Sequence, residues 1–216
     1  MTPFTLRGIL KSMNESLKNL SAWLGRGSIN VFGPPFAGKD TQGRELAKLL
    51  NGALIAGGDV LRSYHDQGEI DRIMARGDLL PSDLYLKIML SYLSKPEFKN
   101  EPLILSAMGR LRGEESIVMK ATTEGGHPIK AVVFLQLTEE EIWKRFEAAK
   151  ALHDRGDRGD DRREALENRL IKFRTQTLPV IEFYRERGLL VEVDGSLARE
   201  KVTDEIIKAL GTFASK

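Results

Sequence analysis

One stretch decides the fold of this chain: Ser28-Ile29-Asn30-Val31-Phe32-Gly33-Pro34-Pro35-Phe36-Ala37-Gly38-Lys39-Asp40-Thr41-Gln42. Its apolar first part is rich in residues that favour strands and predicts a short buried strand. A Gly-x-x-x-x-Gly-Lys loop follows, and a helical pattern of apolar residues begins after the loop. Strand, glycine loop and helix in this order are typical of a phosphate-binding P-loop.

The residue types in this loop suit a nucleotide phosphate. Gly33 and Gly38 can adopt backbone angles that turn successive N–H groups toward one concavity, and an anion there also meets the positive end of the following helix. Lys39 adds a charge that can reach the terminal phosphates of a nucleoside triphosphate. A purely structural turn is the alternative, and the flanking strand and helix argue against it.

Length and composition bound the possible functions. The chain has 216 residues, which suits one domain with a sizeable core. Its 33 basic and 31 acidic side chains leave a net charge of +2, so no overall field points to nucleic acid or to a membrane. The absence of cysteine excludes disulfides and thiol catalysis and fits a reducing cytosol.

The amino-terminal segment predicts an amphipathic helix over residues 4–24, so we treat residues 1–27 as a helical extension. Apolar residues recur there at spacings of three and four: Leu6, Ile9, Leu10, Met13, Leu17, Leu20 and Leu24. Polar residues interrupt them, which excludes a signal peptide, and no other stretch could span a bilayer. We therefore expect a cytoplasmic protein whose helix packs on its own surface. A subunit contact or a docking site for a partner remains an alternative.

Short strands alternate with helices along the rest of the chain, which predicts an α/β fold with a parallel sheet between two helical layers. Five stretches are predicted as strands: residues 28–32, 53–56, 103–105, 131–135 and 189–193. Ligands of such sheets bind beyond the carboxyl ends of the strands. Polar, glycine-containing segments follow three of the predicted strands, so we expect these segments to form one site.

Several segments together resemble the adenylate kinase family of nucleoside monophosphate kinases, over roughly residues 28–210. The family's P-loop, Gly-x-Pro-x-x-Gly-Lys-Gly-Thr-Gln, matches Gly33–Gln42, which explains why Thr41 stands one place later than in the strict P-loop pattern. Further family motifs match Gly57–Arg62, Met74–Leu80, Ser106–Arg110, Arg158–Asp161 and Arg169. The resemblance implies a P-loop kinase domain over residues 28–216, with a monophosphate-binding region at 57–95 and a short lid at 151–165.

The resemblance also implies Mg²⁺-dependent, reversible transfer of the γ-phosphoryl group of ATP to a nucleoside monophosphate, with AMP as the first guess. Under it the catalytic residues are Lys39, Arg110, Arg158 and Arg169. The implied ATP site comprises Gly33, Pro35, Phe36, Ala37, Gly38, Lys39, Asp40, Thr41, Gln42 and Arg145, the last stacking on the base. The implied monophosphate site comprises Gly57, Asp59, Arg62, Leu79, Leu80, Arg110 and Glu114. Thr41 is the expected Mg²⁺ ligand, with Asp40 and Asp59 as candidates through water.

Three positions depart from the family pattern. The aspartate that orients the magnesium waters in the family is Ser106 here, and Asp40, in place of a glycine, could supply a carboxylate or repel the phosphates. The family proline is Gly109, so the loop that presents Arg110 is expected to be looser or differently shaped. Gly57 replaces a residue beside the acceptor base. Glu114 could accept a hydrogen bond from an exocyclic amine of adenine or cytosine, or be an exposed helix-start glutamate.

Two alternatives stand beside the kinase hypothesis. One is a P-loop kinase that acts on another small acceptor. The other is a catalytically weak nucleotide-binding protein whose amino-terminal helix docks a partner. We expect a monomer, with a dimer through that helix as the alternative, and no nucleic-acid or membrane partner.

Overall fold

The computed structural model describes residues 15–64, 67–152 and 162–216, and within them five strands form one sheet. The strands are β1 (Ser28–Phe32), β2 (Ala53–Ala56), β3 (Leu103–Ser106), β4 (Ile129–Gln136) and β5 (Leu190–Asp194). Their order is β2-β3-β1-β4-β5, and every neighbouring pair is parallel. The parallel sheet predicted from the sequence is confirmed, with strand ends within two residues of the expected ones.

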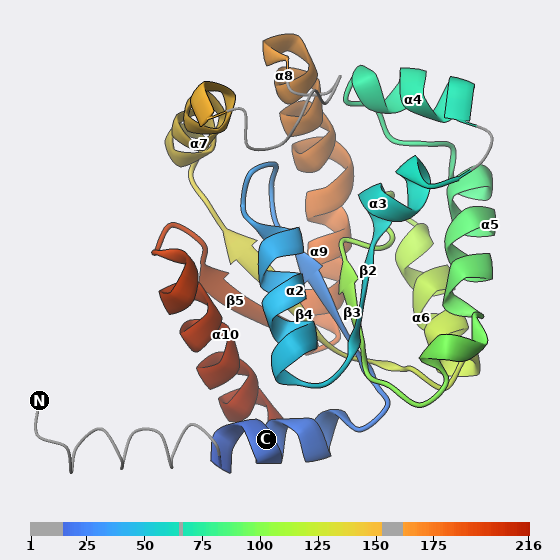
Figure 1. Cartoon of the computed structure of the whole chain (residues 1–216), viewed down its shortest axis with the longest axis vertical. Coiled ribbons are helices and arrows are strands. Elements are labelled where there is room, and N and C mark those ends of the chain that lie inside the picture. The colour runs from blue at the N-terminus through green and yellow to red at the C-terminus, as the bar shows by residue number, and fades with distance from the viewer. Residues whose placement is uncertain (1–14, 65–66, 153–161) are drawn as a thin grey trace, which may run out of the picture.

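Helices connect the strands and cover both faces of the sheet (Figure 1). The structure has α2 (Lys39–Leu49), α3 (Gly57–Arg62), α4 (Gln67–Ala75), α5 (Ser82–Leu93), η1 (Pro96–Phe98), α6 (Glu114–Glu124), α7 (Glu139–Leu152), α8 (Arg163–Lys172), η2 (Phe173–Thr177), α9 (Leu178–Glu186) and α10 (Arg199–Ala214). After β1 the chain runs to β2 at one edge of the sheet, and after β3 it runs to β4 on the other side of β1, so the strand order reverses between β1 and β3. Parallel sheets bind ligands at the point where the order reverses.

Alternation along the strands divides the interior into two cores. On β1, Ile29 and Val31 face one core, and Phe32 lies in the other. On β3, Ile104 packs in the first core, whereas Leu103 and Leu105 pack in the second. Successive side chains of a strand point to opposite faces, so strands buried on both sides need apolar residues at nearly every position. This explains why the predicted strands are continuous apolar runs.

The amino-terminal helix belongs to the first of these cores. Within its described part, residues 15–24, Leu20 and Leu24 are buried against the sheet and α10. Trp23 makes an edge-on ring contact with Phe213 near the carboxyl terminus, with the ring centroids 6.1 Å apart. Figure 1 shows this helix and the C-terminus side by side at the base of the molecule. The described part of the apolar stripe therefore packs within its own chain, and residues 4–14 of the predicted helix lie outside the described residues.

The long helix expected around residues 164–187 is interrupted. It consists of α8, a π-helical stretch at η2, and α9. Pro179 stands in the first turn of α9 and has no N–H to donate to the preceding turn. A π-helical stretch inserts one extra residue per turn and is frequent near functional sites. Here Phe173 and Thr177 of this stretch line the main pocket, which the P-loop also lines.

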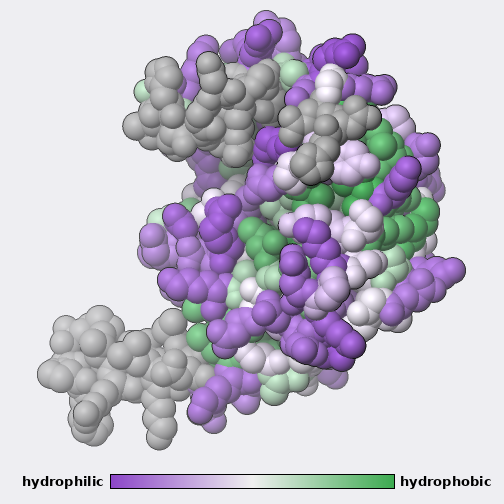
Figure 2. All heavy atoms as spheres, turned by 45° about the vertical axis from the view of Figure 1, so that its right-hand side comes forward, coloured by the Kyte–Doolittle hydropathy of each residue, from purple (hydrophilic) through white to green (hydrophobic). Residues whose placement is uncertain are grey.

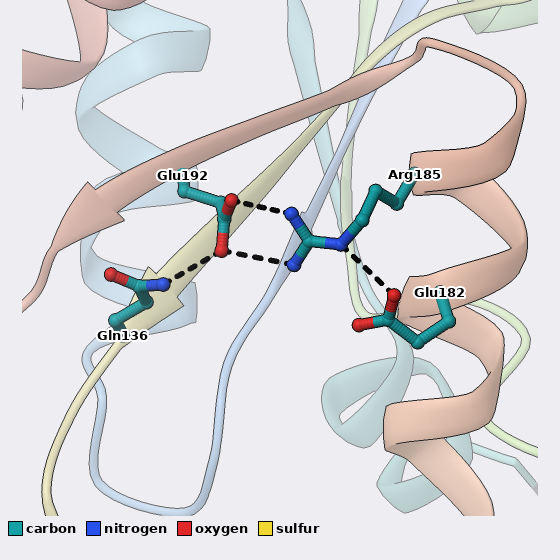
Figure 3. Close-up of polar contacts among 4 residues, drawn as sticks. All are labelled: Gln136, Glu182, Arg185 and Glu192. Carbon is teal, nitrogen blue, oxygen red and sulfur yellow. Dashed lines mark hydrogen bonds and ion pairs between the residues drawn. The ribbon is translucent and has the colours of Figure 1, made fainter.

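A network of charged side chains joins α9 to the edge strand β5 (Figure 3). The Arg185 guanidinium donates to both carboxylate oxygens of Glu192, over 2.6 and 3.0 Å, and its Nε donates to Glu182 over 2.9 Å. Gln136 of β4 donates to Glu192 over 2.7 Å. These groups are exposed, so the network contributes little stability, but it links three neighbouring elements.

Hydrophilic side chains cover much of the face drawn in Figure 2, with hydrophobic surface in patches between them. The large apolar side chains that are exposed come from separate elements: Leu49, Ile117, Ile171 and Leu197. In the described part of the chain, no helix is both long and apolar enough to cross a membrane.

Candidate active site

The P-loop lies between β1 and α2 and leaves the first turn of α2 open toward a pocket. Gly38 precedes the helix in the left-handed region, with φ 85° and ψ 21°, and no side chain caps the helix start. Phe36 also has a positive φ, 62°, which is uncommon for a residue with a side chain. The Lys39 ammonium donates to the Pro34 carbonyl over 2.8 Å, which holds it across the loop. Uncapped amides beside a lysine form an anion-binding site.

The same pocket is lined on its other side by basic residues from distant segments. Arg62 ends α3, Arg110 follows β3, and Arg169 and Lys172 come from α8. All four face the cavity into which Lys39 also points. The sheet brings them together because β1, β2 and β3 end at one edge. The pocket therefore combines the P-loop lysine with four basic side chains from other segments.

Asp40 and Ser106 meet inside this pocket. The Ser106 hydroxyl donates to Asp40 Oδ1 over 2.5 Å, although the residues are 66 positions apart. Burial opposes ionisation of Asp40. The Ser106 bond and the charges of Lys39, Arg110 and Arg62 outweigh that effect and lower the pKa of Asp40 below its ordinary value. Asp40 is thus an ionised carboxylate that faces the site.

The loop that presents Arg110 is firmly held, contrary to the expectation that Gly109 loosens it. Asn30 accepts from the Met108 amide over 3.1 Å and donates to the Met108 carbonyl over 2.8 Å. The Tyr85 hydroxyl accepts from the Gly109 amide over 3.1 Å. Gly109 has φ 75°, which the ring of a proline cannot reach. The loop has a different shape from one with proline, and side chains fix that shape.

Glu114 completes this bracing. Its Oε2 accepts from the backbone amides of Arg110 and Leu111, over 2.9 and 3.0 Å. Glu114 is only 3% exposed, so the alternative of an exposed helix-start glutamate is wrong. Burial raises the pKa of Glu114, and hydrogen bonds from Leu111, Ser82 and Arg110 act against this rise. The carboxylate is first of all an acceptor for its own loop.

A second, less polar pocket adjoins the main one. Its apolar lining comes from Leu61, Met74, Leu79, Leu80 and Leu111, and Tyr85 and Glu114 add polar atoms. Burial raises the pKa of Tyr85 to about 12, so its hydroxyl stays protonated at neutral pH. Gly58 and Arg110 line both pockets. A flat aromatic group in the smaller pocket would therefore lie beside an anion held by the arginines.

Some predicted site residues have other contacts. The Gln42 side chain binds α10, donating to the Arg199 carbonyl over 3.0 Å and accepting from Thr203 over 2.8 Å. Arg145 donates to the carbonyls of Phe36 and Gly195, over 3.3 and 2.6 Å. Neither side chain lines the two pockets. Arg145 supports the P-loop backbone, and Gln42 ties the P-loop helix to α10.

Three other predicted site residues in the described part of the chain are not among the residues that line the two pockets. Asp59 pairs with Arg62 at 2.6 Å and orients that guanidinium. Ala37 is buried within the P-loop. At Gly57 an added Cβ would meet nothing closer than 3.7 Å, so a larger residue would fit there. Arg158 lies outside the described residues, as does most of the predicted lid.

The predicted monophosphate-binding region contacts α8 at Gly77. A Cβ on this residue, whose φ is 74°, would lie 2.4 Å from the Ala165 carbonyl oxygen, so only glycine fits. Beside it, Asn168 donates to the Arg76 carbonyl and to Asp78, each over 2.8 Å. Lys172 lies 3.7 Å from Asp78. These contacts place α8, which carries Arg169, against the segment that lines the smaller pocket.

Sequence reasoning missed several residues of this site. Lys172 stands one helical turn after Arg169, and that spacing could have indicated it. Asn30 and Tyr85 look like ordinary strand and helix residues, and only the fold brings them to the 107–111 loop. The bond between Asp40 and Ser106 joins two departures from the family pattern that the sequence presents separately.

Comparison with known proteins also indicates the adenylate kinase family. The family model for adenylate kinase matches residues 31–189. The chain is 34% identical to an adenylate kinase of Parvibaculum lavamentivorans, over 86% of this chain and 93% of that protein. It is 33% identical to one from Thermus thermophilus (85% and 97% covered) and 31% identical to one from Leptospira biflexa (82% and 96%). The matched segment contains the P-loop, Arg62, Arg110 and α8. We conclude that this chain belongs to the adenylate kinase family of nucleoside monophosphate kinases.

Proposed function

We propose that this protein transfers the γ-phosphoryl group of ATP to AMP, reversibly and with Mg²⁺, giving two molecules of ADP. The observation that carries the proposal is the shared pocket, whose lining combines Lys39 of the P-loop with Arg62 and Arg110. A hydrolase acting on one nucleotide needs a single phosphate site. A transferase between two nucleotides needs two phosphate sites that meet.

The donor side is built by the P-loop. The open amides at the start of α2 and the Lys39 ammonium suit the triphosphate of ATP. Asp40 and Thr41 also line the pocket and contribute hard oxygen atoms, which Mg²⁺ prefers. Among the described residues, no group of three or more acidic, histidine or cysteine side chains could hold a metal alone. This fits an ion bound mainly by phosphates and water, which would neutralise phosphate charge when ATP binds.

The acceptor side is built by α3, the segment around Leu79 and the loop after β3. Arg62 and Arg110 suit the monophosphate, because guanidinium groups bind phosphate oxygens in pairs. The smaller pocket suits the base, with its apolar lining and the polar atoms of Tyr85 and Glu114. Glu114 uses Oε2 for its own loop, so its other oxygen would accept from the amino group of adenine.

Transfer itself requires positioning and charge cancellation rather than a covalent intermediate. Lys39, Arg110 and Arg169 all line the pocket that would hold the reacting phosphates. The guanidinium carbon of Arg169 lies 6.0 Å from the centre of the Phe36 ring. We assign Arg158 to the same group on the basis of the family motif alone.

The proposal is tested by a phosphoryl-transfer assay with Mg·ATP and AMP, CMP, UMP, GMP or dTMP in turn, with diphosphate products separated by chromatography. We expect ADP from AMP, with activity lost in Lys39→Ala. The exposed Lys48, in the last turn of the same helix, provides the control Lys48→Ala. A product from another acceptor alone would replace AMP in the proposal. No product from any acceptor, despite ATP binding, would overturn it.

We further propose that a monomer carries out the reaction. The residues of both pockets come from one chain, and the apolar face of the amino-terminal helix is buried against the protein's own core through Leu20 and Leu24. The helix would have to leave this core to dock a partner. Sedimentation of the full chain at assay concentration tests the proposal, and a dimer would contradict it.

A further inference from the structure

Asp40 is an unusual feature of a phosphate site. The described lining of the main pocket contains two carboxylates, Asp40 and Asp78. Asp78 is paired with basic side chains, at 3.4 Å from Arg76 and 3.7 Å from Lys172. Asp40 instead stands at the second position of α2, where the amides of the first turn open toward the pocket. A negative charge there would repel a triphosphate unless a cation lies between them.

The structure orients this carboxylate into the site. Ser106, at the end of β3, donates to Asp40 Oδ1, and Val31 of β1 lies in register with Ser106. The sheet thus fixes the hydroxyl beside the P-loop. Among the described residues, no hydrogen bond to Asp40 Oδ2 occurs, although Asp40 lines the cavity. One oxygen is held and the other can bind a ligand.

The two departures from the family pattern are therefore in direct contact. By the family resemblance, an aspartate is expected where Ser106 stands and a glycine where Asp40 stands. The chain has a hydroxyl and a carboxylate at these positions, in hydrogen-bonding contact. The number of carboxylates is unchanged, and the carboxylate has moved from the end of β3 to the start of α2.

We propose that Asp40 is the residue that orients the hydrated Mg²⁺ of Mg·ATP in this protein, with Ser106 as its positioning residue. The proposal rests on the proposed function, because it concerns the metal-bound donor nucleotide. A carboxylate accepts hydrogen bonds from metal-bound water far more strongly than a neutral serine hydroxyl does. A Mg²⁺ ion between Asp40 and the phosphates would also remove the repulsion between these two negative groups.

A structural role is the competing explanation. Acidic residues in the first turn of a helix stabilise it through the helix dipole, without any ligand. That role affects thermal stability and is independent of Mg²⁺. The two explanations separate when ATP binding is measured with and without the metal.

The experiment is isothermal titration of the full-length protein with ATP, once in excess Mg²⁺ and once in EDTA. The quantity of interest is the Kd in EDTA divided by the Kd in excess Mg²⁺, which measures how much the metal strengthens ATP binding. Asp40→Asn keeps an oxygen acceptor for Ser106 and removes the charge. We expect it to weaken Mg·ATP binding and strengthen metal-free ATP binding, so that the ratio falls about 10- to 100-fold, as for outer-sphere partners of metals. The matched control is Glu200→Gln, an exposed acid in the first turn of α10, which should leave the ratio unchanged.

Further variants test the exchange of positions. Ser106→Ala removes the bond that holds Oδ1 and should reduce the ratio less than Asp40→Asn does. The double variant Asp40→Gly with Ser106→Asp returns the carboxylate to the end of β3, and we expect it to restore most of the ratio. Ser106→Asp alone places two carboxylates in contact, which raises the pKa of one of them and should weaken metal-free ATP binding most of all. Thermal melts of each variant confirm that it folds.

An unchanged ratio in a folded Asp40→Asn protein would overturn the proposal and leave the helix-start role. The same holds if Asp40→Gly with Ser106→Asp binds Mg·ATP no better than Asp40→Gly alone. These measurements need no turnover. Failure to form ADP in the transfer assay would therefore count against the proposed function, whereas a flat Kd ratio would count against the role of Asp40.

Discussion

Arg185 on the surface and Arg110 in the pocket are both guanidinium groups with carboxylates nearby, but their surroundings differ. Arg185 makes three hydrogen bonds to Glu182 and Glu192, and Gln136 adds a fourth bond to the same group of residues (Figure 3). The side chain of Arg110 donates through Nε to the Ala107 carbonyl over 3.2 Å, and it lines both pockets. The surface arginine is matched by protein groups, whereas the pocket arginine faces ligand space.

The charge balance of the two regions differs in the same way. In the surface network two carboxylates surround one guanidinium. The described lining of the main pocket has five basic side chains, Lys39, Arg62, Arg110, Arg169 and Lys172, and two carboxylates, Asp40 and Asp78. Accumulating like charges costs folding free energy, and a polyanionic ligand offsets that cost. We therefore expect substitutions in the pocket to affect activity and those in the network to have small effects on stability.

The largest effect is expected from Arg110→Ala. Losing a guanidinium that binds the acceptor phosphate should lower kcat/KM for AMP by about 10²- to 10³-fold, as for other charge-stabilising donors. The control is Arg112→Ala, two residues away, exposed and outside the pocket lining. Steady-state kinetics at saturating Mg·ATP measures the difference. Equal activity of the two variants would contradict the assignment of Arg110 to the acceptor.

Glu114→Ala should have the next largest effect, because it removes the acceptor that braces the loop as well as the proposed acceptor for the base. It leaves the amides of Arg110 and Leu111 without their acceptor, which costs about 1–3 kcal/mol of unfolding free energy. Glu114→Gln retains an oxygen acceptor and should lose less. Urea denaturation provides the stability, and the KM for AMP shows whether Arg110 is displaced. Wild-type stability together with altered base preference would indicate that Glu114 reads the base instead.

Asn168→Ala sharpens the comparison at the edge of the pocket. Asn168 joins α8 to Arg76 and Asp78 through two hydrogen bonds, and its loss should loosen the acceptor segment. Two net bonds are worth about 1–3 kcal/mol, and if about half of this reaches acceptor binding, the KM for AMP should rise roughly twofold to twelvefold. Asn100→Ala, in an exposed turn, is the control. An effect on Mg·ATP binding instead would contradict the placement of this contact on the acceptor side.

Arg185→Ala should have the smallest effect, because its ion pairs are exposed to solvent and screened by salt. Hydrogen bonds from Arg185 lower the pKa of Glu192. The bridge therefore contributes stability above the ordinary Glu192 pKa of 4.5, and this contribution is lost as the pH falls through the lower folded value. Thermal melts should separate the variant from the wild type slightly at neutral pH, and the two should converge in acid. A gap that widens in acid, or a marked loss of activity, would disprove this interpretation.

Local patterns were enough to predict much of the molecule. Continuous apolar runs such as the one through Val132 predicted strands buried on both faces, because strand burial depends on nearest neighbours and period. Gly33 and Gly38 predicted the P-loop: Gly38 has a positive φ, and a Cβ at Gly33 would lie 3.0 Å from Ala37 and Leu135. The basic residues Arg62, Arg110 and Arg169 were predicted from the resemblance to the family's motifs, and all three line the main pocket.

Contacts between distant segments decided the rest. Asn30, Tyr85 and Glu114 brace one loop from three separate elements, and no local pattern indicates such a meeting. The sequence by itself determined the fold class, the phosphate site and the family, since these depend on local periodicity and on motifs of fixed spacing. Only the tertiary structure decided that Asp40 turns inward to Ser106 and that Gln42 turns away, because the direction of a side chain is set by the partners that the folded sheet brings to it.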